Sequence, residues 1–349
     1  MTLEEALKRI KKPDEEAMMQ CRCRWDSIAK PLHSLGKLED YLIQIAGITG
    51  SGVIELKKKA LVVMCADNGV VEEGVTQTGQ EVTAIVAENF LKEQATASIL
   101  CSTAGADIYP VDIGVASDVP IINRKISYGT GNITKGPAMT RPETIRALET
   151  GIQIVGELKE KGYSIIATGE MGIGNTTTGS AVSAVLLGLP VETVTGRGAG
   201  LSSEGLERKI TAIKKAIEVN QPVKEDGIDV LSKVGGLDIA GMTGLFLGGA
   251  AMGVPIVIDG FISAVSALAA VTICPLARFY MLPSHVSKEP AAHLILESMQ
   301  MEAALTCDMC LGEGTGAVAL FPILDMACTV YDRMSTFQEI EVEEYKPLE

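Results

Sequence analysis

One glutamate stands among glycines, in the string Leu311-Gly-Glu-Gly-Thr-Gly316. Its small neighbours leave open space beside the carboxyl of Glu313, and sparse hydration raises the pKa of a carboxyl toward the range of a useful general base. A helix start close by would lower the same pKa. The string therefore indicates either a general base at Glu313 or a glutamate that caps a glycine turn.

A second glycine string, Gly172-Ile-Gly-Asn-Thr-Thr-Thr178, follows an apolar run and precedes a helical pattern at 180–187. Glycines let the backbone approach a ligand closely, and the free N–H groups of a helix start attract anions. The string lacks the third glycine of a dinucleotide fingerprint and the lysine of a P-loop. It is equally compatible with a phosphate site and with a structural turn.

Two further polar segments carry candidate ligands. The segment 195–203 leads into a helix with Lys209, so Arg197 or Lys209 would lie near a phosphate or a ribose, although a serine N-cap alone explains it. The segment 284–290 contains His285, for which a surface or core position is favoured over catalysis, and no nucleophile elbow is present. Cys21-Arg-Cys23 and Cys307-Asp-Met-Cys310 lack an accompanying histidine, so neither a metal nor a redox role is expected.

These strings must be positioned by strands and helices that alternate along the chain. Apolar β-branched runs predict strands at 60–65, 107–113, 164–168, 254–258 and 271–274, and the patterns at 203–219 and about 238–251 predict helices. Strands that are apolar throughout, with helices between them, predict a parallel sheet covered on both faces.

Both ends of the chain have helical patterns without strand signals. We expect a Rossmann-like, doubly wound α/β domain over residues 26–300 and a small helical bundle from 1–25 and 301–349, with an acidic solvated tail at 339–344. In open parallel sheets ligands bind beyond the carboxyl ends of the strands. Polar or glycine-rich residues follow three of the expected strands, at 66–69, 169–178 and 259–263, and predict a site at that edge.

Composition and charge narrow the classes of function. Hydrophobic residues make up 47% of the 349 residues and charged residues 21%, which is typical of a folded globule with a sizeable core. The net charge of −14 disfavours nucleic acid and anionic membranes, which require a basic face. The uncharged stretch 239–258 is interrupted by Pro255 and several glycines, which favours a buried helix and strand over a membrane span. The mixed-charge N-terminus and eight cysteines predict reduced thiols in a cytoplasmic protein.

Eight strings, taken in order, resemble the nicotinate-nucleotide–dimethylbenzimidazole phosphoribosyltransferases of cobamide assembly over nearly the whole chain. Each string alone is weak, but their number and order make the match specific. They are Lys30-Pro-Leu-His-Ser-Leu-Gly-Lys-Leu-Glu39, Ala66-Asp-Asn-Gly-Val-Val-Glu-Glu-Gly-Val75, Gln80-Glu-Val-Thr83, Gly136-Pro-Ala-Met139, Gly169-Glu-Met-Gly-Ile-Gly-Asn-Thr-Thr177, Gly235-Gly-Leu-Asp-Ile-Ala240, Asp259-Gly-Phe-Ile-Ser263 and Leu311-Gly-Glu-Gly-Thr-Gly316.

The resemblance implies transfer of the phosphoribosyl group from nicotinate mononucleotide to an aromatic base, with inversion at the anomeric carbon and release of nicotinate. It also implies a Rossmann-like domain, a small helical bundle from both chain ends, and a dimer in which each cavity is completed by the neighbour's small domain. No cofactor is implied, because nicotinate leaves from a pyridinium that already carries a positive charge. The protein then has only to position the substrates and accept a proton.

The same resemblance implies roles for individual residues. Glu313 matches the general base, and Glu170 matches a second glutamate beside the ribose. Phosphate and ribose contacts are implied for Gly172, Gly174, Asn175, Thr176, Gly198, Lys209 and Ser287. Base contacts are implied for Thr76, Ile85 and Leu311.

Two positions depart from the family pattern. Asn68 stands where the string commonly reads Ala-Asp-His-Gly, and Ile85 stands where many members have a glutamine facing the base. That glutamine can bond the second nitrogen of a benzimidazole, and a buried ring nitrogen left unpaired costs about 1–3 kcal/mol. The acceptor is expected to be dimethylbenzimidazole or a phenolic such as phenol or p-cresol.

The resemblance extends to a subgroup of this family that uses phenolic acceptors and works as a heterodimer of two related subunits, so it implies either a homodimer or a heterodimer. The alternative function is a catalytically silent subunit that supports a partner's active site. The presence of both Glu313 and Glu170 disfavours this alternative.

Overall fold

Six parallel strands form one sheet within residues 1–345, the part of the chain that the computed structural model describes. The strands are β1 (Lys59–Ala66), β2 (Ala106–Gly114), β3 (Ile122–Asn123), β4 (Ile165–Met171), β5 (Ile256–Ile258) and β6 (Met281–Pro283). Their order across the sheet is β3-β2-β1-β4-β5-β6. The order reverses between β1 and β4, which is the place where an open parallel sheet has its ligand crevice.

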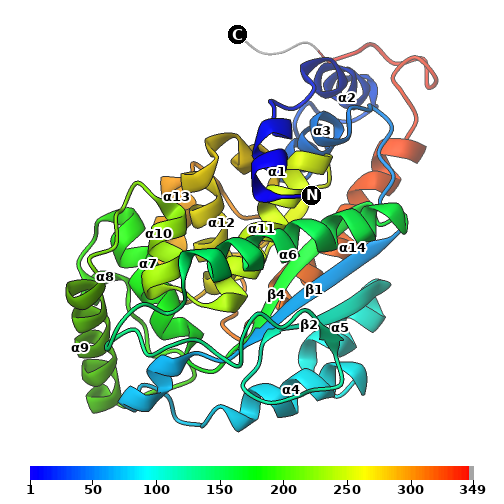
Figure 1. Ribbon diagram of the computed structural model, residues 1–349. Coiled ribbons are helices and arrows are strands. Elements are labelled where there is room, and N and C mark those ends of the chain that lie inside the picture. The colour runs from blue at the N-terminus through cyan, green and yellow to red at the C-terminus, as the bar shows by residue number, and fades with distance from the viewer. Residues whose placement is uncertain (346–349) are drawn as a thin grey trace.

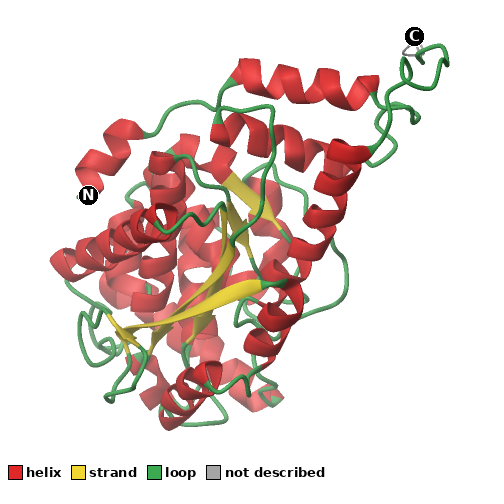
Figure 2. Ribbon diagram, turned by 90° about the vertical axis from the view of Figure 1, so that its right-hand side faces the viewer, coloured by secondary structure: helices red, strands yellow, loops and turns green. Residues whose placement is uncertain are grey.

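Helices lie on both sides of the sheet, as Figures 1 and 2 show. They are α1 (Leu3–Arg9), α2 (Glu15–Ser27), α3 (Lys37–Thr49), the 3-10 helix η1 (Gly69–Glu73), α4 (Glu81–Leu91), α5 (Thr96–Ala104), α6 (Arg141–Glu160), α7 (Asn175–Leu187), α8 (Val191–Val194), α9 (Ser203–Asn220), α10 (Gly227–Val234), α11 (Leu237–Met252), α12 (Phe261–Ile273), the 3-10 helix η2 (Pro275–Tyr280), α13 (Pro290–Ser298) and α14 (Thr315–Arg333).

The central strand β1 divides its side chains between two hydrophobic cores. Successive side chains of a strand point to opposite faces of the sheet. The residues at 60, 62, 64 and 66 pack with α6 and α11, whereas those at 61, 63 and 65 pack with α5 and α14. The predicted α/β fold, a parallel sheet with helices on both faces, is therefore confirmed.

The expected strands at 60–65, 107–113, 164–168 and 254–258 correspond to β1, β2, β4 and β5. The strand expected at 271–274 is wrong, because residues 271–273 form the last turn of α12 and the next strand is β6. The part of α12 from 261 to 270 is buried all round. Such a helix has no polar stripe, so its β-branched end resembles a strand in the sequence.

The two ends of the chain are helical only in part. α1 and α2 account for the N-terminal pattern, and α14 is the helix of the C-terminal segment within the described residues. Trp25 of α2 meets Tyr331 of α14 edge to face, with ring centroids 5.0 Å apart. The acidic tail at 339–344 is exposed as expected. The division into domains 26–300 and 1–25 with 301–349 stays a prediction, and 346–349 lie outside the described residues.

The uncharged stretch 239–258 contains most of α11 and all of β5. α11 is buried between the sheet and α6. Within residues 1–345 no helix is long and apolar enough to cross a membrane. The glycines of α11 instead allow its backbone to touch that of α6. A Cβ on Gly244 would overlap the carbonyl oxygen of Leu148, and a Cβ on Gly151 would lie 2.6 Å from the backbone nitrogen of Leu245.

We expect Gly244→Ala to lower the free energy of unfolding by about 1–3 kcal/mol, because the added methyl must push two packed helices apart. Gly156→Ala on α6 is the matched control, since its Cβ would lie 3.5 Å from the sulfur of Met252, an ordinary contact. The control should be neutral or gain roughly 0.5–1 kcal/mol from the better helix propensity of alanine. Urea unfolding of both variants measures the difference, and equal midpoints would contradict the close helix contact.

Candidate active site

A cleft of about 310 Å³ opens where β4, β5 and β6 end. Its walls come from six places in the chain: the end of β4 with the start of α7, the loop before α9, the start of α12, the segment after β6, the loop before α14, and α4. The lining residues are Val86, Glu170, Met171, Gly172, Ile173, Asn175, Thr176, Gly198, Ala199, Asp259, Gly260, Phe261, Ile262, Ser263, His285, Ser287, Glu289, Cys310, Leu311, Gly312 and Glu313.

Most of the residues that the sequence singled out meet in this cleft. Those that line it are Glu170, Glu313, Gly172, Asn175, Thr176, Gly198, Ser287 and Leu311.

Four others lie outside the lining. Gly174 is the N-cap of α7 and Lys209 lies directly behind Thr176. Thr76 donates its hydroxyl to the carbonyl of Thr78, and the side chain of Ile85 on α4 is 56% exposed.

Glu313 has a left-handed backbone, with φ of 60°, between two glycines that also have positive φ. Its carboxylate accepts a hydrogen bond of 3.2 Å from the N–H of Ala97 in the first turn of α5. Burial raises the pKa of Glu313, whereas the Ala97 N–H lowers it and the charge of Asp259 raises it further. Both opposing effects expected from the sequence are present, and burial is the larger.

Asp259 holds the backbone that carries Glu313. Its carboxylate accepts hydrogen bonds from the N–H groups of Gly314 (3.2 Å), Gly316 (2.7 Å) and Ala317 (3.0 Å) at the start of α14. A Cβ on Gly169 would lie 2.5 Å from the carbonyl oxygen of Glu313, so β4 supports the same loop from below. Asp259 begins the segment 259–263, which predicted a site at this edge of the sheet, but no individual role was predicted for it. The feature of the sequence that could have identified Asp259 is its place as an acidic residue between an apolar strand and a glycine.

Glu170 and Asp238 form a second group of carboxyls, joined by Asn175. The Nδ2 of Asn175 donates to an oxygen of Glu170 and, over 3.1 Å, to an oxygen of Asp238. Burial, with the charge of Asp238, raises the pKa of Glu170 to about 8, and burial raises the pKa of Asp238 to about 7. Asp238 was also missed, although a lone charge at the start of an apolar helix marked it.

Lys209 is fully buried beneath the start of α7. Its Nζ donates to the hydroxyl of Thr176 (2.9 Å) and the carbonyl of Gly196 (3.1 Å), and burial lowers its pKa to about 8. Ser202 caps α9 by accepting from the N–H of Gly205, so the expected serine N-cap is present, and a phosphate or ribose contact of this segment stays a prediction. Arg197 bonds within its own segment, to the carbonyl of Leu201 and the hydroxyl of Ser203.

His285 is buried and lines the cleft, with its Nδ1 3.2 Å from the hydroxyl of Ser284. Cys310 is exposed at the rim, and all eight cysteines are free thiols. Within the described part of the chain, no group of three or more His, Cys, Asp or Glu residues is placed to hold a metal.

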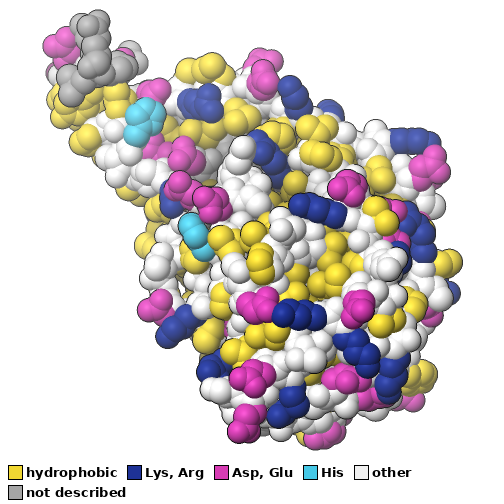
Figure 3. Space-filling model, turned by 90° about the vertical axis from the view of Figure 1, so that its left-hand side faces the viewer, with side chains coloured by type: hydrophobic (Ala, Val, Ile, Leu, Met, Phe, Trp, Pro, Cys, Tyr) yellow, Lys and Arg dark blue, Asp and Glu magenta, His cyan; other side chains and the backbone are white. Residues whose placement is uncertain are grey.

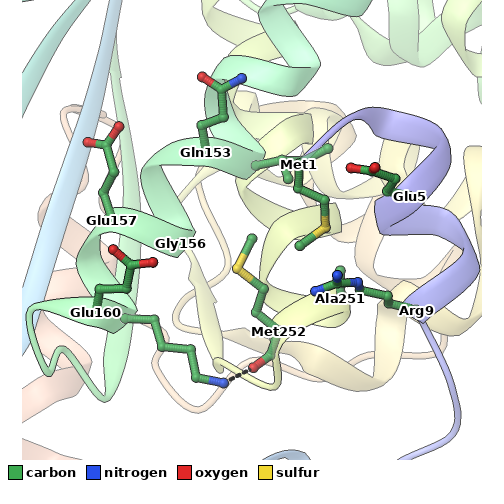
Figure 4. Close-up of a pocket in the computed structure, with 11 residues that line it drawn as sticks. Met1, Glu5, Arg9, Gln153, Gly156, Glu157, Glu160, Ala251 and Met252 are labelled. Atoms are coloured by element: carbon green, nitrogen blue, oxygen red, sulfur yellow. Dashed lines mark hydrogen bonds between the residues drawn. The ribbon is translucent and has the colours of Figure 1, made fainter.

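A larger groove of about 960 Å³ lies at the other end of the sheet, between α1, α6 and the end of α11 (Figure 4). Its charged side chains, Glu5, Arg9, Glu157 and Glu160, do not converge on one point in the close-up. Lys159 donates to the backbone carbonyl of Met252 there. None of the residues predicted for the site lines this groove.

Charges of both signs are mixed on the face that Figure 3 shows, with Lys and Arg side chains scattered among Asp and Glu. Lys214 of α9, for example, pairs with Glu192 of α8. Such a mixed face offers no continuous positive surface to a polyanion.

A family model described as phosphoribosyltransferase matches residues 10–342. The nicotinate-nucleotide–dimethylbenzimidazole phosphoribosyltransferase of Ruminiclostridium cellulolyticum is 53% identical over 352 residues, and that of Clostridium acetobutylicum is 50% identical over 351, each with 100% of both chains covered. The crystal structure of the Thermus thermophilus enzyme of the same name is similar with a TM-score of 0.89 at 38% identity, covering 95% of this chain and 100% of that chain.

We expect Asp259→Asn to lower the free energy of unfolding by about 1–3 kcal/mol, because one acceptor oxygen becomes an amide that faces an N–H group. Asp308→Asn is the matched control, since Asp308 lies exposed on the segment before Glu313. Thermal unfolding at neutral pH measures both variants. The same melting temperature for both would mean that the three hydrogen bonds do not hold the start of α14.

Proposed function

Because the chain belongs to the nicotinate-nucleotide–dimethylbenzimidazole phosphoribosyltransferase family, we propose that it transfers the phosphoribosyl group of nicotinate mononucleotide to dimethylbenzimidazole and releases nicotinate. The observation that carries the proposal is the meeting of Glu170, Glu313 and the start of α7 in one cleft at the strand ends. Two carboxyls of raised pKa and a helix N-terminus are the groups this transfer requires.

The phosphate is proposed to bind at the start of α7. Main-chain N–H groups in the first turn of a helix attract an anion, and α7 begins at the wall of the cleft with Asn175 and Thr176. Lys209 supports this position from behind through the hydroxyl of Thr176. A Cβ on Gly198 would lie 2.8 Å from that hydroxyl, so a glycine there leaves room for the side chain of Thr176.

The transfer itself exchanges one bond at the anomeric carbon for another. The bond between C1′ and the pyridinium nitrogen breaks, and its electron pair neutralises the ring of the departing nicotinate. Glu170 is proposed to lie beside the positive charge that develops on the ribose. The attacking nitrogen of the base forms the new bond to C1′, and its N–H proton passes to the carboxylate of Glu313.

The acceptor we propose is dimethylbenzimidazole, the base in the names of the relatives. A phenolic acceptor depends on Ile85 facing the base, and this side chain is 56% exposed, whereas its neighbour Val86 lines the cleft. Leu311, 58% exposed at the rim, offers an apolar contact for an aromatic ring.

The active form we propose is a dimer. The apolar side chain of Leu311 is exposed at the rim of the cleft, and a second subunit would cover such a surface. Sedimentation of the isolated 36.8 kDa chain distinguishes a homodimer from a chain that needs a related subunit.

Purified chain is expected to convert nicotinate mononucleotide and dimethylbenzimidazole into nicotinate and the α-riboside phosphate. Glu313→Gln should keep the fold and lose turnover by roughly 10²–10⁴-fold, because the attacking base loses its proton acceptor. Product chromatography with the wild type and the variant measures both. No product from the wild-type chain alone would favour the silent-subunit alternative, and unchanged turnover in Glu313→Gln would remove Glu313 from the mechanism.

We expect Ile85→Gln to change the ratio of kcat/KM between dimethylbenzimidazole and p-cresol by less than about 2-fold. A new hydrogen bond to the base would change this ratio by roughly 10-fold. Val86→Gln is the matched comparison, because the adjacent side chain lines the cleft and a polar group there should change KM for the base. A shift of about 10-fold toward dimethylbenzimidazole in Ile85→Gln would favour the phenolic acceptor in the wild type.

A further inference from the structure

Glu170, which lines the cleft, and the buried Asp238, which does not, accept hydrogen bonds from the same side chain. Asn175 donates through its Nδ2 to Glu170 and to Asp238, the latter over 3.1 Å. Asp238 is fully buried in the first turn of α11, and within residues 1–345 its Oδ1 has no hydrogen-bond partner. The family resemblance and the proposed reaction give Asp238 no role.

Glycines on two sides give the Asp238 carboxyl its space. A Cβ on Gly172 would lie 2.6 Å from Oδ2, and a Cβ on Gly236 would lie 2.5 Å from Oδ1. The close fit leaves the carboxyl little freedom to turn toward solvent, so its charge stays next to that of Glu170.

The groups that face this pair are mostly acidic. The charges acting on Glu170 are those of Asp238 and Asp259, and Asp67 acts on Asp238. The positive groups stand one step further away, beside these neighbours rather than beside the pair. The titratable groups around the pair are Cys65 of β1, Asp67 after β1, Asp112 of β2 with its partner Lys125, Asp259 after β5 with its neighbour His285, and Glu313 before α14.

Two carboxylates held this close in a space of low dielectric do not both ionise at neutral pH, and the pair then titrates as a unit. The raised pKa values, about 8 for Glu170 and about 7 for Asp238, agree with this geometry. A carboxyl with a raised pKa keeps its proton at a pH below that pKa and loses it at a pH above it. The pair in the empty cleft therefore carries a proton at pH 7.

We propose that Asp238 is a positioning residue whose buried charge, held beside Glu170 by the shared Asn175, keeps one proton in the pair, and that the pair releases this proton when a pyridinium ring enters the cleft. The O–H bond of the pair breaks and the proton passes to the solvent, while the ring supplies the compensating positive charge. The inference rests on the proposed function for the identity of the ligand that carries this pyridinium ring.

The release would leave Glu170 as a carboxylate when nicotinate begins to depart. A carboxylate stabilises the positive charge that develops at C1′ more than a neutral carboxyl does. Since the proton leaves only after the cation has entered, the empty cleft does not hold two adjacent buried charges.

Isothermal titration calorimetry of the full chain with nicotinate mononucleotide, in two buffers of different ionisation enthalpy, counts the protons released. At pH 7 we expect roughly one proton per bound ligand for the wild type, and a count that falls as the pH rises past about 8. Asp238→Asn should still bind and should lose most of this release. Glu170→Gln removes the other carboxyl and should release as few protons per bound ligand as Asp238→Asn. The inference can therefore still be tested if one of the two variants does not fold.

Two controls separate the pair from other groups in the cleft. Ribose 5-phosphate, which has the phosphate without the pyridinium, should bind without the release. Glu313→Gln should keep it, because Glu313 does not share the Asn175 donor. An unchanged proton count in Asp238→Asn overturns the inference and leaves the proposed function intact, whereas no binding of nicotinate mononucleotide by the wild type overturns both.

Discussion

The hydrogen bonds from three main-chain N–H groups to Asp259 are the interaction on which the candidate site depends. They join the end of β5 to the start of α14, two elements far apart in the chain. Between them they fix the backbone of Glu313 in a left-handed conformation that is uncommon for a residue with a side chain. Without this connection, Glu313 would be held only by its hydrogen bond to the N–H of Ala97 and by the contact of its backbone with Gly169 of β4.

The cleft concentrates negative charge, and the proposed substrate explains why such an arrangement is tolerable. Burial raises the pKa of Glu170, Asp238, Asp259 and Glu313, which shifts each carboxyl toward its neutral form and limits the repulsion among them. Nicotinate mononucleotide has a positively charged pyridinium nitrogen, a carboxylate on the same ring and an anionic phosphate. The carboxyls suit the ring, and the start of α7 with Lys209 suits the phosphate, so a chain with a net charge of −14 can still bind an anion locally.

The sequence predicted the parts of the molecule that depend on local pattern. The strands β1, β2, β4 and β5 are apolar throughout because helices cover both faces, and this pattern is visible in any short window. The strand expected at 271–274 failed because α12 is buried all round and its helical period is hidden. Asp238 and Asp259 could not be assigned roles, since each acts on a residue from another element. Ile85 and Val86 are neighbours in the sequence, and only the fold shows which of them lines the cleft.

The position of α14 late in the chain bears on how the molecule is synthesised. Its residues Ala317, Leu320 and Phe321 complete the core on the face of the sheet that holds Leu61, Val63 and Cys65. A chain growing on the ribosome has all six strands and the start of α7 before Glu313 has been translated. Until then this face lacks part of its cover, and exposed apolar surface of that kind is what chaperones bind and what aggregates. A messenger truncated near its end would therefore yield a chain that still has its strands but lacks both Glu313 and part of its core.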